Sequence, residues 1–269
     1  MSVTVTSFTY VSDLVRQHSA IQLGPGKEYL VESRLMPLAR ARGLSGTDAV
    51  ENYVQQVRRA NDPGEITQVV EALTTNETSW FRDSVPFMAL KNHILPALGS
   101  DVRIWSAACS TGQEPYSIAM TLQDTTVPRF SILGTDLNGA VLDQARSGRY
   151  SQLEVNRGLP APMLVKHFER AGAAWQVRPE LRRAVTFRQH NLLQPLPEPG
   201  GFDVIFLRNV LIYFDLPTKR DILGRLRRRL RPGGFLVLGA AETTVGIDPA
   251  WDRVEVTRGS VYQLSGGKA

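Results

Sequence analysis

The sequence predicts an α/β protein built around a parallel sheet, with a small all-helical domain over residues 1–75 and a second domain over residues 76–269 that carries a small β insertion at about 163–183. Apolar residues recur at helical spacing through residues 1–75. From Val102 onward, short apolar runs alternate with helical segments, which is typical of βαβ units around a parallel sheet. Between Tyr150 and Ala184, a segment with the alternating run AWQVRPEL fits no βα unit, so we expect an inserted β element there.

The composition is that of a globular protein, since 42 % of the 269 residues are hydrophobic and 21 % are charged. No apolar run approaches the roughly 20 residues that a membrane span requires. The start, MSVTVTSFTYVSDL, lacks the features of a signal peptide. We therefore expect a soluble, cytoplasmic protein with no membrane insertion. A single cysteine, Cys109, excludes an internal disulfide and a cysteine-based metal centre, and we predict no metal.

The chain is basic, with a formal charge of +5 and a pI of about 9.5, which favours an anionic partner such as nucleic acid or an acidic protein surface. Residues 1–75 contain seven basic and eight acidic side chains, so the excess lies further along. It concentrates in residues 157–188 and 219–231. In the second stretch, Ile222, Leu223, Leu226 and Leu230 form an apolar stripe at helical spacing. We interpret the arginines opposite that stripe as a solvated helix face.

In the helical domain, Gly24-Pro25-Gly26, Gly43 and residues 61–64 interrupt the periodicity. Pro37 is expected to end or kink any helix there, with Arg40 and Arg42 projecting from the segment after it. These arginines, with Arg34, either dock an acidic partner or form a solvated basic surface.

The sheet domain contains five expected core strands and a terminal hairpin. A helix from Asp215 to Leu230 should begin with Pro217 in its first turn and stop at Pro232-Gly233-Gly234. The runs WDRVEV and SVYQLS around residues 257–259 predict an antiparallel hairpin at the sheet edge. The five strands are VRIWSAA (102–108), FSILGTD (130–136), AVTFRQ (184–189), FDVIFLR (202–208) and GGFLVLGA (233–240).

The first chemical motif, residues 106–116 (SAACSTGQEPY), leaves the first strand and opens a helix. Open α/β sheets bind nucleotides at such a position, but the GxGxxG fingerprint of a pyrophosphate cradle is absent. A dinucleotide is therefore disfavoured. A nucleoside without phosphates, such as S-adenosylmethionine, needs small residues and a carboxylate or amide, and Glu114 is suitably placed for one contact.

Later motifs supply polar groups at the ends of the other strands. Asp136 ends the second strand, where an acidic side chain ordinarily accepts both hydrogen bonds of a ribose diol. The alternative is that Asp136 or Asn138 caps the next helix, and we assign that role to Asn138. Asn191 offers an amide beside the expected adenine position, and residues 206–215 would line the cleft.

Upstream of the sheet, residues 76–82 (NETSWFR) resemble the signature of the CheR family of bacterial chemotaxis receptor methyltransferases. The motifs at 106–116, 135–137, 191–193, 208–215 and 230–234 recur in that family's order, so the resemblance covers nearly the whole chain. It implies a Rossmann-like class I methyltransferase sheet after an N-terminal helical domain. It also implies transfer of the methyl group of S-adenosylmethionine to receptor glutamate side chains, giving methyl esters and S-adenosylhomocysteine in sensory adaptation.

The resemblance also implies the cofactor contacts and the partner. The partner is the cytoplasmic helical region of chemotaxis receptors, whereas docking on a receptor's C-terminal peptide is doubtful because the loop at 170–175 is short. Family members usually have two acids before the proline of the first motif, whereas this chain has Gln113-Glu114, and Asn138 stands where an acid is common. The implied cofactor contacts are Asn76, Thr78, Arg82, Glu114, Asp136, Asn191, Leu192, Arg208 and Asn209.

The chemistry needs no enzyme base, because a glutamate with a pKa near 4.3 is already ionised at neutral pH. The remaining task is alignment of the acceptor. Arg82 and Tyr213 are the expected catalytic residues, holding the acceptor carboxylate by charge and by a phenolic donor. The alternatives are that Arg82 binds only the cofactor and that Tyr213 only packs against the following helix. The four histidines show no ligand spacing, so we take them as structural or exposed, and Cys109 as a packing residue beside the cofactor.

Two rival functions remain. A nucleic-acid methyltransferase agrees with the pI, but the chain lacks an Asn/Asp-Pro-Pro-aromatic tetrad, a cleft cysteine motif and aromatic residues interleaved with basic ones. We therefore expect no nucleic-acid partner. A non-catalytic sensor that only binds the cofactor would be favoured by loss of Arg82 or Tyr213, and both are present.

Overall fold

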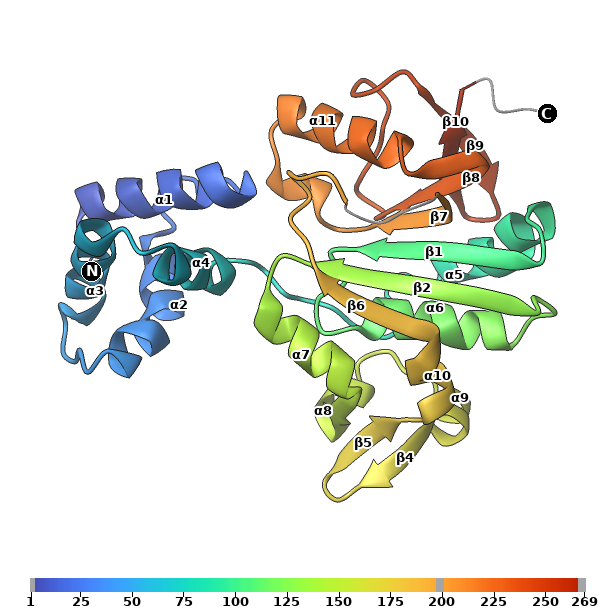
Figure 1. Ribbon diagram of the computed structural model, residues 1–269, viewed down its shortest axis with the longest axis horizontal. Helices are drawn as coiled ribbons and strands as arrows, with labels where there is room; N and C mark the ends of the chain where they lie inside the picture. The colour runs from blue at the N-terminus through green and yellow to red at the C-terminus, as the bar shows by residue number, and fades with distance from the viewer. Residues whose placement is uncertain (1–2, 197–200, 266–269) are drawn as a thin grey trace. The chain divides into compact units, whose positions relative to one another are not determined.

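The computed structural model describes residues 3–196 and 201–265, and it divides into two compact units (Figure 1). The first unit is Met1–Thr75 with Tyr213–Asp215, and the second is Asn76–Ile212 with Leu216–Ala269. None of the helices in the described ranges has the length and apolar character needed to cross a bilayer.

The N-terminal unit is all-helical, as the periodicity predicts. Its helices are α1 (Val5–Ser19), α2 (Glu28–Ala41), α3 (Ala49–Ala60) and α4 (Pro63–Ala72). Side-chain caps begin two of them: the Thr4 hydroxyl accepts from the Ser7 N–H, and the Asp62 carboxylate accepts from the Glu65 N–H. Buried aliphatic residues such as Val15, Val31 and Leu35 form the core between them.

The sequence predicts that Pro37 ends or kinks its helix, and the proline does not end it, because α2 continues through Pro37 to Ala41. Proline cannot donate to the carbonyl of Ser33, four residues earlier. Both Pro37 and Ser33 are exposed, so that carbonyl can bond to water instead. Arg40 therefore belongs to the last turn of α2 and Arg42 is its C-cap residue.

The second unit contains a seven-stranded sheet in the order β6-β2-β1-β7-β8-β10-β9. The first five strands in this order pair in parallel, and β10 and β9 add an antiparallel hairpin at one edge, as expected. The strands are β1 (Asp101–Ala107), β2 (Arg129–Asp136), β6 (Val185–Gln189), β7 (Phe202–Leu207), β8 (Leu230–Leu238), β9 (Trp251–Val256) and β10 (Gly259–Leu264). The helical segments outside the insertion are α5 (Val85–Ala89), η1 (Leu90–Ile94), η2 (Leu95–Ala97), α6 (Gln113–Gln123), α7 (Gly139–Ser147), η3 (Leu211–Tyr213) and α11 (Leu216–Arg227).

The end of α11 differs from the expectation, since the helix stops at Arg227 and β8 already begins at Leu230. The Pro232-Gly233-Gly234 sequence lies inside the strand rather than stopping the helix. A register shift between Phe202 and Val204 absorbs the extra residues, as a bulge does. A Cβ at Gly234 would lie 2.8 Å from the carbonyl oxygen of Asp203, so the close approach of β8 to β7 at this point requires glycine.

The expected β insertion is present as a three-stranded antiparallel sheet in the order β3-β5-β4. Trp175 fastens it, because its Nε1 donates to Gln152 Oε1 at 2.9 Å and the Arg170 guanidinium lies 4.4 Å from its ring centroid. The elements are β3 (Arg149–Ser151), α8 (Gln152–Val155), α9 (Ala161–His167), β4 (Phe168–Ala171), β5 (Ala174–Val177) and α10 (Pro179–Ala184).

Candidate active site

The polar residues predicted for the site lie at or just after the carboxyl ends of adjacent parallel strands (Figure 1). Glu114 is in the first turn of α6, which follows β1, and Asp136 is the last residue of β2. Asn191 follows β6 by two residues, and Arg208 directly follows β7. Because the carboxyl ends of parallel strands meet at one edge, these four side chains share that edge.

Asp136 is buried and both its carboxylate oxygens are engaged by backbone amides. Oδ2 accepts from the Ser110 N–H at 2.8 Å and Oδ1 from the Asn138 N–H at 3.0 Å. These two bonds fix the orientation of the carboxylate. Ser110 has φ of +51° and donates its hydroxyl to the Asn76 carbonyl at 2.8 Å, which joins this loop to the 76–82 segment.

Asn138 is the N-cap of α7, as predicted, because its Oδ1 accepts from the N–H groups of Ala140 and Val141. Asp136 therefore bonds to the loop backbone and is not the N-cap of α7.

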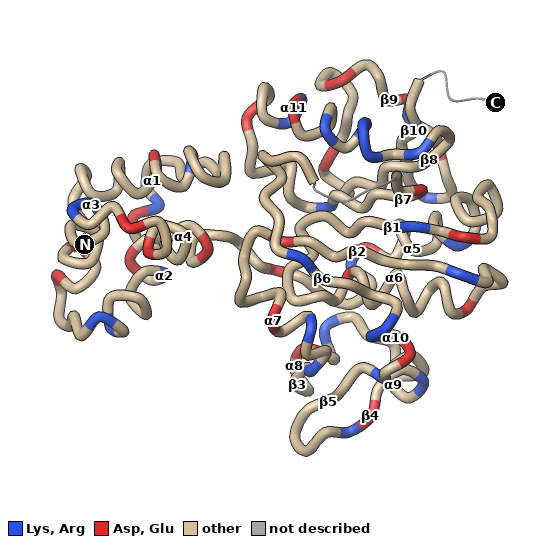
Figure 2. The backbone as a smooth tube through the Cα atoms, in the orientation of Figure 1, with Lys and Arg blue, Asp and Glu red and all other residues tan. Residues whose placement is uncertain are grey.

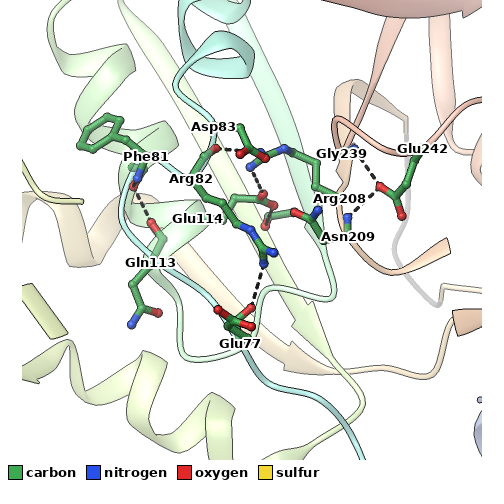
Figure 3. A network of polar contacts seen from close by, with 12 residues as sticks. Glu77, Phe81, Arg82, Asp83, Gln113, Glu114, Arg208, Asn209, Gly239 and Glu242 are labelled. Carbon is green, nitrogen blue, oxygen red and sulfur yellow. Dashed lines mark hydrogen bonds and ion pairs between the residues drawn. The ribbon is translucent and has the colours of Figure 1, made fainter. Parts of the chain in front are cut away.

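Arg208 is a buried cation that joins three parts of the site (Figure 3). Nη1 contacts Glu114 Oε2 at 3.0 Å, and Nη2 contacts Asp83 Oδ2 at 3.0 Å and the Arg82 carbonyl at 2.7 Å. The Arg208 guanidinium carbon also lies 5.7 Å from the ring centroid of Phe87. The end of β7 is therefore tied both to α6 and to the segment before the sheet.

Glu114 accepts a second bond at its other oxygen, from Ser106 Oγ at 2.7 Å. Its side chain is only 12 % exposed, and Arg208 compensates its charge. Within the described residues, the buried Arg208 Nε has no hydrogen-bond partner. An unpaired buried donor is costly, so this N–H suits an oxygen acceptor from a ligand.

The segment from Asn76 to Asp83 is anchored by Trp80. The Trp80 ring is buried and makes edge contacts to Tyr150 and Phe168, at centroid distances of 4.9 and 5.2 Å. The backbone N–H of Trp80 donates to the Arg157 carbonyl at 3.0 Å. A Cβ at Gly158 would lie 2.3 Å from the Trp80 carbonyl oxygen, so glycine is required for this approach.

Around this anchor the backbone is strained. Phe81 and Asp83 have φ of +47° and +55°, a region that residues with a Cβ rarely adopt. The Phe81 N–H donates to Ser117 Oγ at 3.1 Å, and Arg208 holds Asp83. Such strain persists where the surroundings enforce it, and it is typical of ligand-binding segments. Arg82, between the two strained residues, is half-buried and donates Nη1 to the Glu77 carbonyl at 3.1 Å.

Glu242 shapes the loop after β7, and none of the sequence motifs predicts this role. Its carboxylate accepts from the N–H groups of Asn209, Val210 and Leu211 at 2.7 to 2.9 Å, and from that of Gly239 at 2.8 Å (Figure 3). This lets Asn209 adopt a φ of +59°. The sequence feature that could have indicated this role is an acidic residue just beyond the carboxyl end of β8, a central parallel strand.

Asn191 and Leu192 form the fourth edge of the site. The His190 N–H donates to the Asp136 carbonyl at 2.8 Å, which continues the pairing of β6 with β2 beyond the strands. Asn191 Oδ1 accepts from the Leu193 N–H at 3.0 Å, which closes a turn at the adenine position that the sequence predicts.

The structure brings the nine predicted cofactor residues into the second unit, whereas Tyr213 clusters with the N-terminal unit. There the Tyr213 carbonyl accepts from the Gln22 N–H at 3.4 Å. Direct contacts link Asn76 to Asp136 through Ser110, and link the Arg82 carbonyl to Glu114 through Arg208. The individual roles of these residues remain predictions.

The donor set fits S-adenosylmethionine. Carboxylates at Glu114 and Asp136 suit an ammonium group and a ribose diol, and the free Arg208 N–H suits a carboxylate. Cys109 beside them is fully buried, and burial, with Asp136 and Glu114, raises the pKa of its thiol, so it stays neutral and unreactive. Within residues 3–196 and 201–265, no cluster of three His, Cys, Asp or Glu side chains could hold a metal ion.

Comparison with known proteins identifies the family. Residues 76–259 match the model described as CheR methyltransferase, SAM binding domain, and residues 6–74 match CheR methyltransferase, all-alpha domain. The chain is 41 % identical to chemotaxis protein methyltransferase Cher2 of Pseudomonas putida, over 90 % of this chain and 92 % of that protein. It is 40 % identical to chemotaxis protein methyltransferase 1 of Pseudomonas aeruginosa, over 98 % and 99 %.

Among solved structures, the N-methyltransferase NodS from Bradyrhizobium japonicum, in complex with S-adenosyl-L-homocysteine, has a TM-score of 0.43 at 16 % identity, over 70 % of this chain and 90 % of that chain. That likeness is too low to add to the assignment. The two family models together span nearly the whole chain and confirm the resemblance seen in the motifs. The chain therefore belongs to the CheR methyltransferase family and is a methyltransferase that uses S-adenosylmethionine.

Proposed function

We propose that the protein transfers the methyl group of S-adenosylmethionine to glutamate side chains in the cytoplasmic helical region of chemotaxis receptors, forming glutamate methyl esters and S-adenosylhomocysteine. The observation that carries this proposal is Arg82. Its guanidinium uses one of five N–H donors on the Glu77 carbonyl and is otherwise unpaired among the described residues. A half-buried cation with spare donors, next to the cofactor residues, suits an acceptor carboxylate.

The chain's own residues then have two tasks, binding and alignment. When bound, S-adenosylmethionine supplies a methyl group on a positively charged sulfur, which a carboxylate oxygen can attack. Asp136 and Asn191 would hold its nucleoside, and Glu114 and Arg208 its amino-acid end. The acceptor glutamate is ionised at neutral pH, so no residue has to remove a proton.

Arg82 would hold the acceptor carboxylate in position, and Tyr213 is the second residue that the sequence predicts for this role. Their binding must stay moderate, since over-stabilising the ground-state carboxylate would slow the transfer. The transfer itself gains from fixing the carboxylate oxygen in line with the methyl group and from excluding water.

We place the reaction in the cytoplasm and expect no dependence on a C-terminal receptor peptide. The connection between β4 and β5 is a tight turn at Gly172, with φ of +66°, between paired Ala171 and Ala174. So short a connection supports recognition through the receptor's helical region alone.

The test is to incubate the protein with S-adenosylmethionine and receptor-containing membranes and to map methyl esters on receptor peptides by mass spectrometry. We expect esters on glutamates, with transfer strongly reduced in Arg82→Gln. Arg157→Gln is the matched control, because Arg157 pairs with Glu77 on the surface at 3.3 Å and has no proposed catalytic role. Methylation confined to other residue types, or equal loss in both variants, would refute the proposal.

A further inference from the structure

Figure 2 shows basic residues along α11. Three arginines near the end of this helix line a cavity, so the expectation of a merely solvated helix face is incomplete. Arg225, Arg228 and Arg229 border a space of about 240 Å³ in the second unit. Its apolar wall includes Trp105, from β1, and Leu226, from α11. The cavity thus combines three guanidinium groups with an aromatic surface.

No Asp or Glu is among the described residues that line this cavity. Arg225 is balanced from outside, by Asp221 at 2.9 Å, and Arg229 donates Nη2 to the Leu196 carbonyl. Arg228 is exposed and makes no ion pair within the described part of the chain. Among the described lining residues, positive side chains therefore outnumber negative ones, and Arg228 keeps N–H donors that no described residue accepts from.

His190 also lines the cavity, and the pKa of its imidazole responds to the same positive charge. Burial, together with Arg225, Arg188 and Arg229, lowers the pKa of its imidazole to about 4. The ring is uncharged at neutral pH and can accept or donate a hydrogen bond.

We propose that this cavity binds a small phosphorylated compound, with its phosphate held by Arg225, Arg228 and Arg229 and its organic part against Trp105. The planar fork of a guanidinium matches two phosphate oxygens, and weak hydration makes arginine suited to partly enclosed anion sites. An apolar wall favours a ligand with a ring or sugar over a free ion.

The cavity also adjoins the proposed cofactor site, and this second step rests on that proposed function. Leu192 lines the cavity, and the His190 N–H holds the Asp136 carbonyl at 2.8 Å. These two residues flank Asn191, the expected adenine contact. A ligand in the cavity that favours one position of this turn would change cofactor affinity, as reciprocal coupling requires.

The first test is calorimetric titration of the full chain with inorganic pyrophosphate at low ionic strength. We expect saturable binding that is about 10-fold to 100-fold weaker in Arg225→Gln/Arg228→Gln, as loss of charge-assisted hydrogen bonds implies. The single variant Arg228→Gln should show part of this loss without touching the Asp221 pair. Arg227→Gln is the matched control for the single variant: it removes one arginine charge at the neighbouring position, but Arg227 lies outside the cavity lining and faces Asp248 at 3.9 Å.

Absence of saturable binding to the wild-type protein, or an equal loss in Arg227→Gln, would overturn the proposal, because surface charge alone would then explain the data. The coupling is tested by titrating S-adenosylhomocysteine with and without pyrophosphate, and a change in its affinity only when Arg225 and Arg228 are intact would support it. Unchanged affinity would overturn the coupling. Failure of S-adenosylhomocysteine to bind at all would instead count against the cofactor site, and pyrophosphate binding would be unaffected.

Discussion

At the residue scale, the single carboxylate of Asp136 has two roles. It orders the loop through the N–H groups of Ser110 and Asn138, and it is the proposed ribose acceptor. Asp136→Asn keeps one carbonyl oxygen for the loop but loses the charge and one acceptor. We expect S-adenosylhomocysteine to bind about 1–3 kcal/mol more weakly to this variant, measured by calorimetry.

The control for this variant is Asp143→Asn, which removes a carboxylate from the same region of the chain. Asp143 is exposed in α7, and within the described part of the chain it pairs only with Arg146, at 2.7 Å. The affinity of Asp143→Asn for S-adenosylhomocysteine should match that of the wild-type protein. Unchanged affinity in Asp136→Asn would remove Asp136 from the cofactor site.

His190 makes stability depend on pH. Its pKa of about 4 lies below the roughly 6.5 of an unfolded histidine, so as the pH falls through this interval the unfolded chain binds a proton that the folded chain does not. Stability is therefore full above about pH 6.5 and is lost toward pH 4. We expect this group to lower the free energy of unfolding by about 2 kcal/mol between pH 7 and pH 5. Urea unfolding of wild type and His190→Asn measures it, and equal losses in the two proteins would contradict the assignment.

At the scale of elements, Arg208 joins β7, α6 and the segment before the sheet. Its side chain is 1 % exposed and faces Glu114, which is 12 % exposed. Arg208→Met would leave that carboxylate buried without its cation, and we expect a loss of about 3–5 kcal/mol in the free energy of unfolding.

Arg157→Met is the comparison for Arg208→Met, since Arg157 pairs with Glu77 at 3.3 Å and both side chains are exposed, at 56 % and 66 %. An exposed pair contributes only about 0–1 kcal/mol. Equal losses in the two variants by denaturant titration would show that Arg208 acts as an ordinary surface pair.

Helix α2 carries the arginines proposed to dock the receptor, and the structure separates their roles. Arg34 donates to the Thr74 carbonyl and Arg42 pairs with the buried Glu65, so both stabilise the helical unit. Arg40 is exposed and makes no ion pair within the described ranges. Arg40→Gln should raise KM for the receptor and weaken its salt dependence, with cofactor affinity unchanged.

Steady-state kinetics at low and high salt measure this effect. Arg59→Gln, an equally exposed arginine in the last turn of α3, is the control and should leave KM unchanged. An unaltered KM for Arg40→Gln at low salt would mean that α2 does not dock the receptor.

Local patterns predicted the elements well but predicted their long-range contacts poorly. Alternation and periodicity located β1, β2, β6 and β7 and the helices between them, and residue type located the Asn138 cap. Glu242 was missed because its role depends on two loops that only the sheet brings together. The continuation of α2 through Pro37 depends on solvent exposure, which the sequence shows only indirectly.

At the scale of the whole molecule, the chain is a methyltransferase of the CheR family, and the reaction we propose for it is the formation of a carboxylate methyl ester. The most direct measurement uses S-adenosylmethionine carrying a tritiated methyl group, the protein and receptor-containing membranes. The proposed function predicts label on the receptor that mild base releases as volatile methanol, since methyl esters hydrolyse there and methylated amines and nucleobases do not. Label that survives base, or that appears on nucleic acid instead of the receptor, would contradict it.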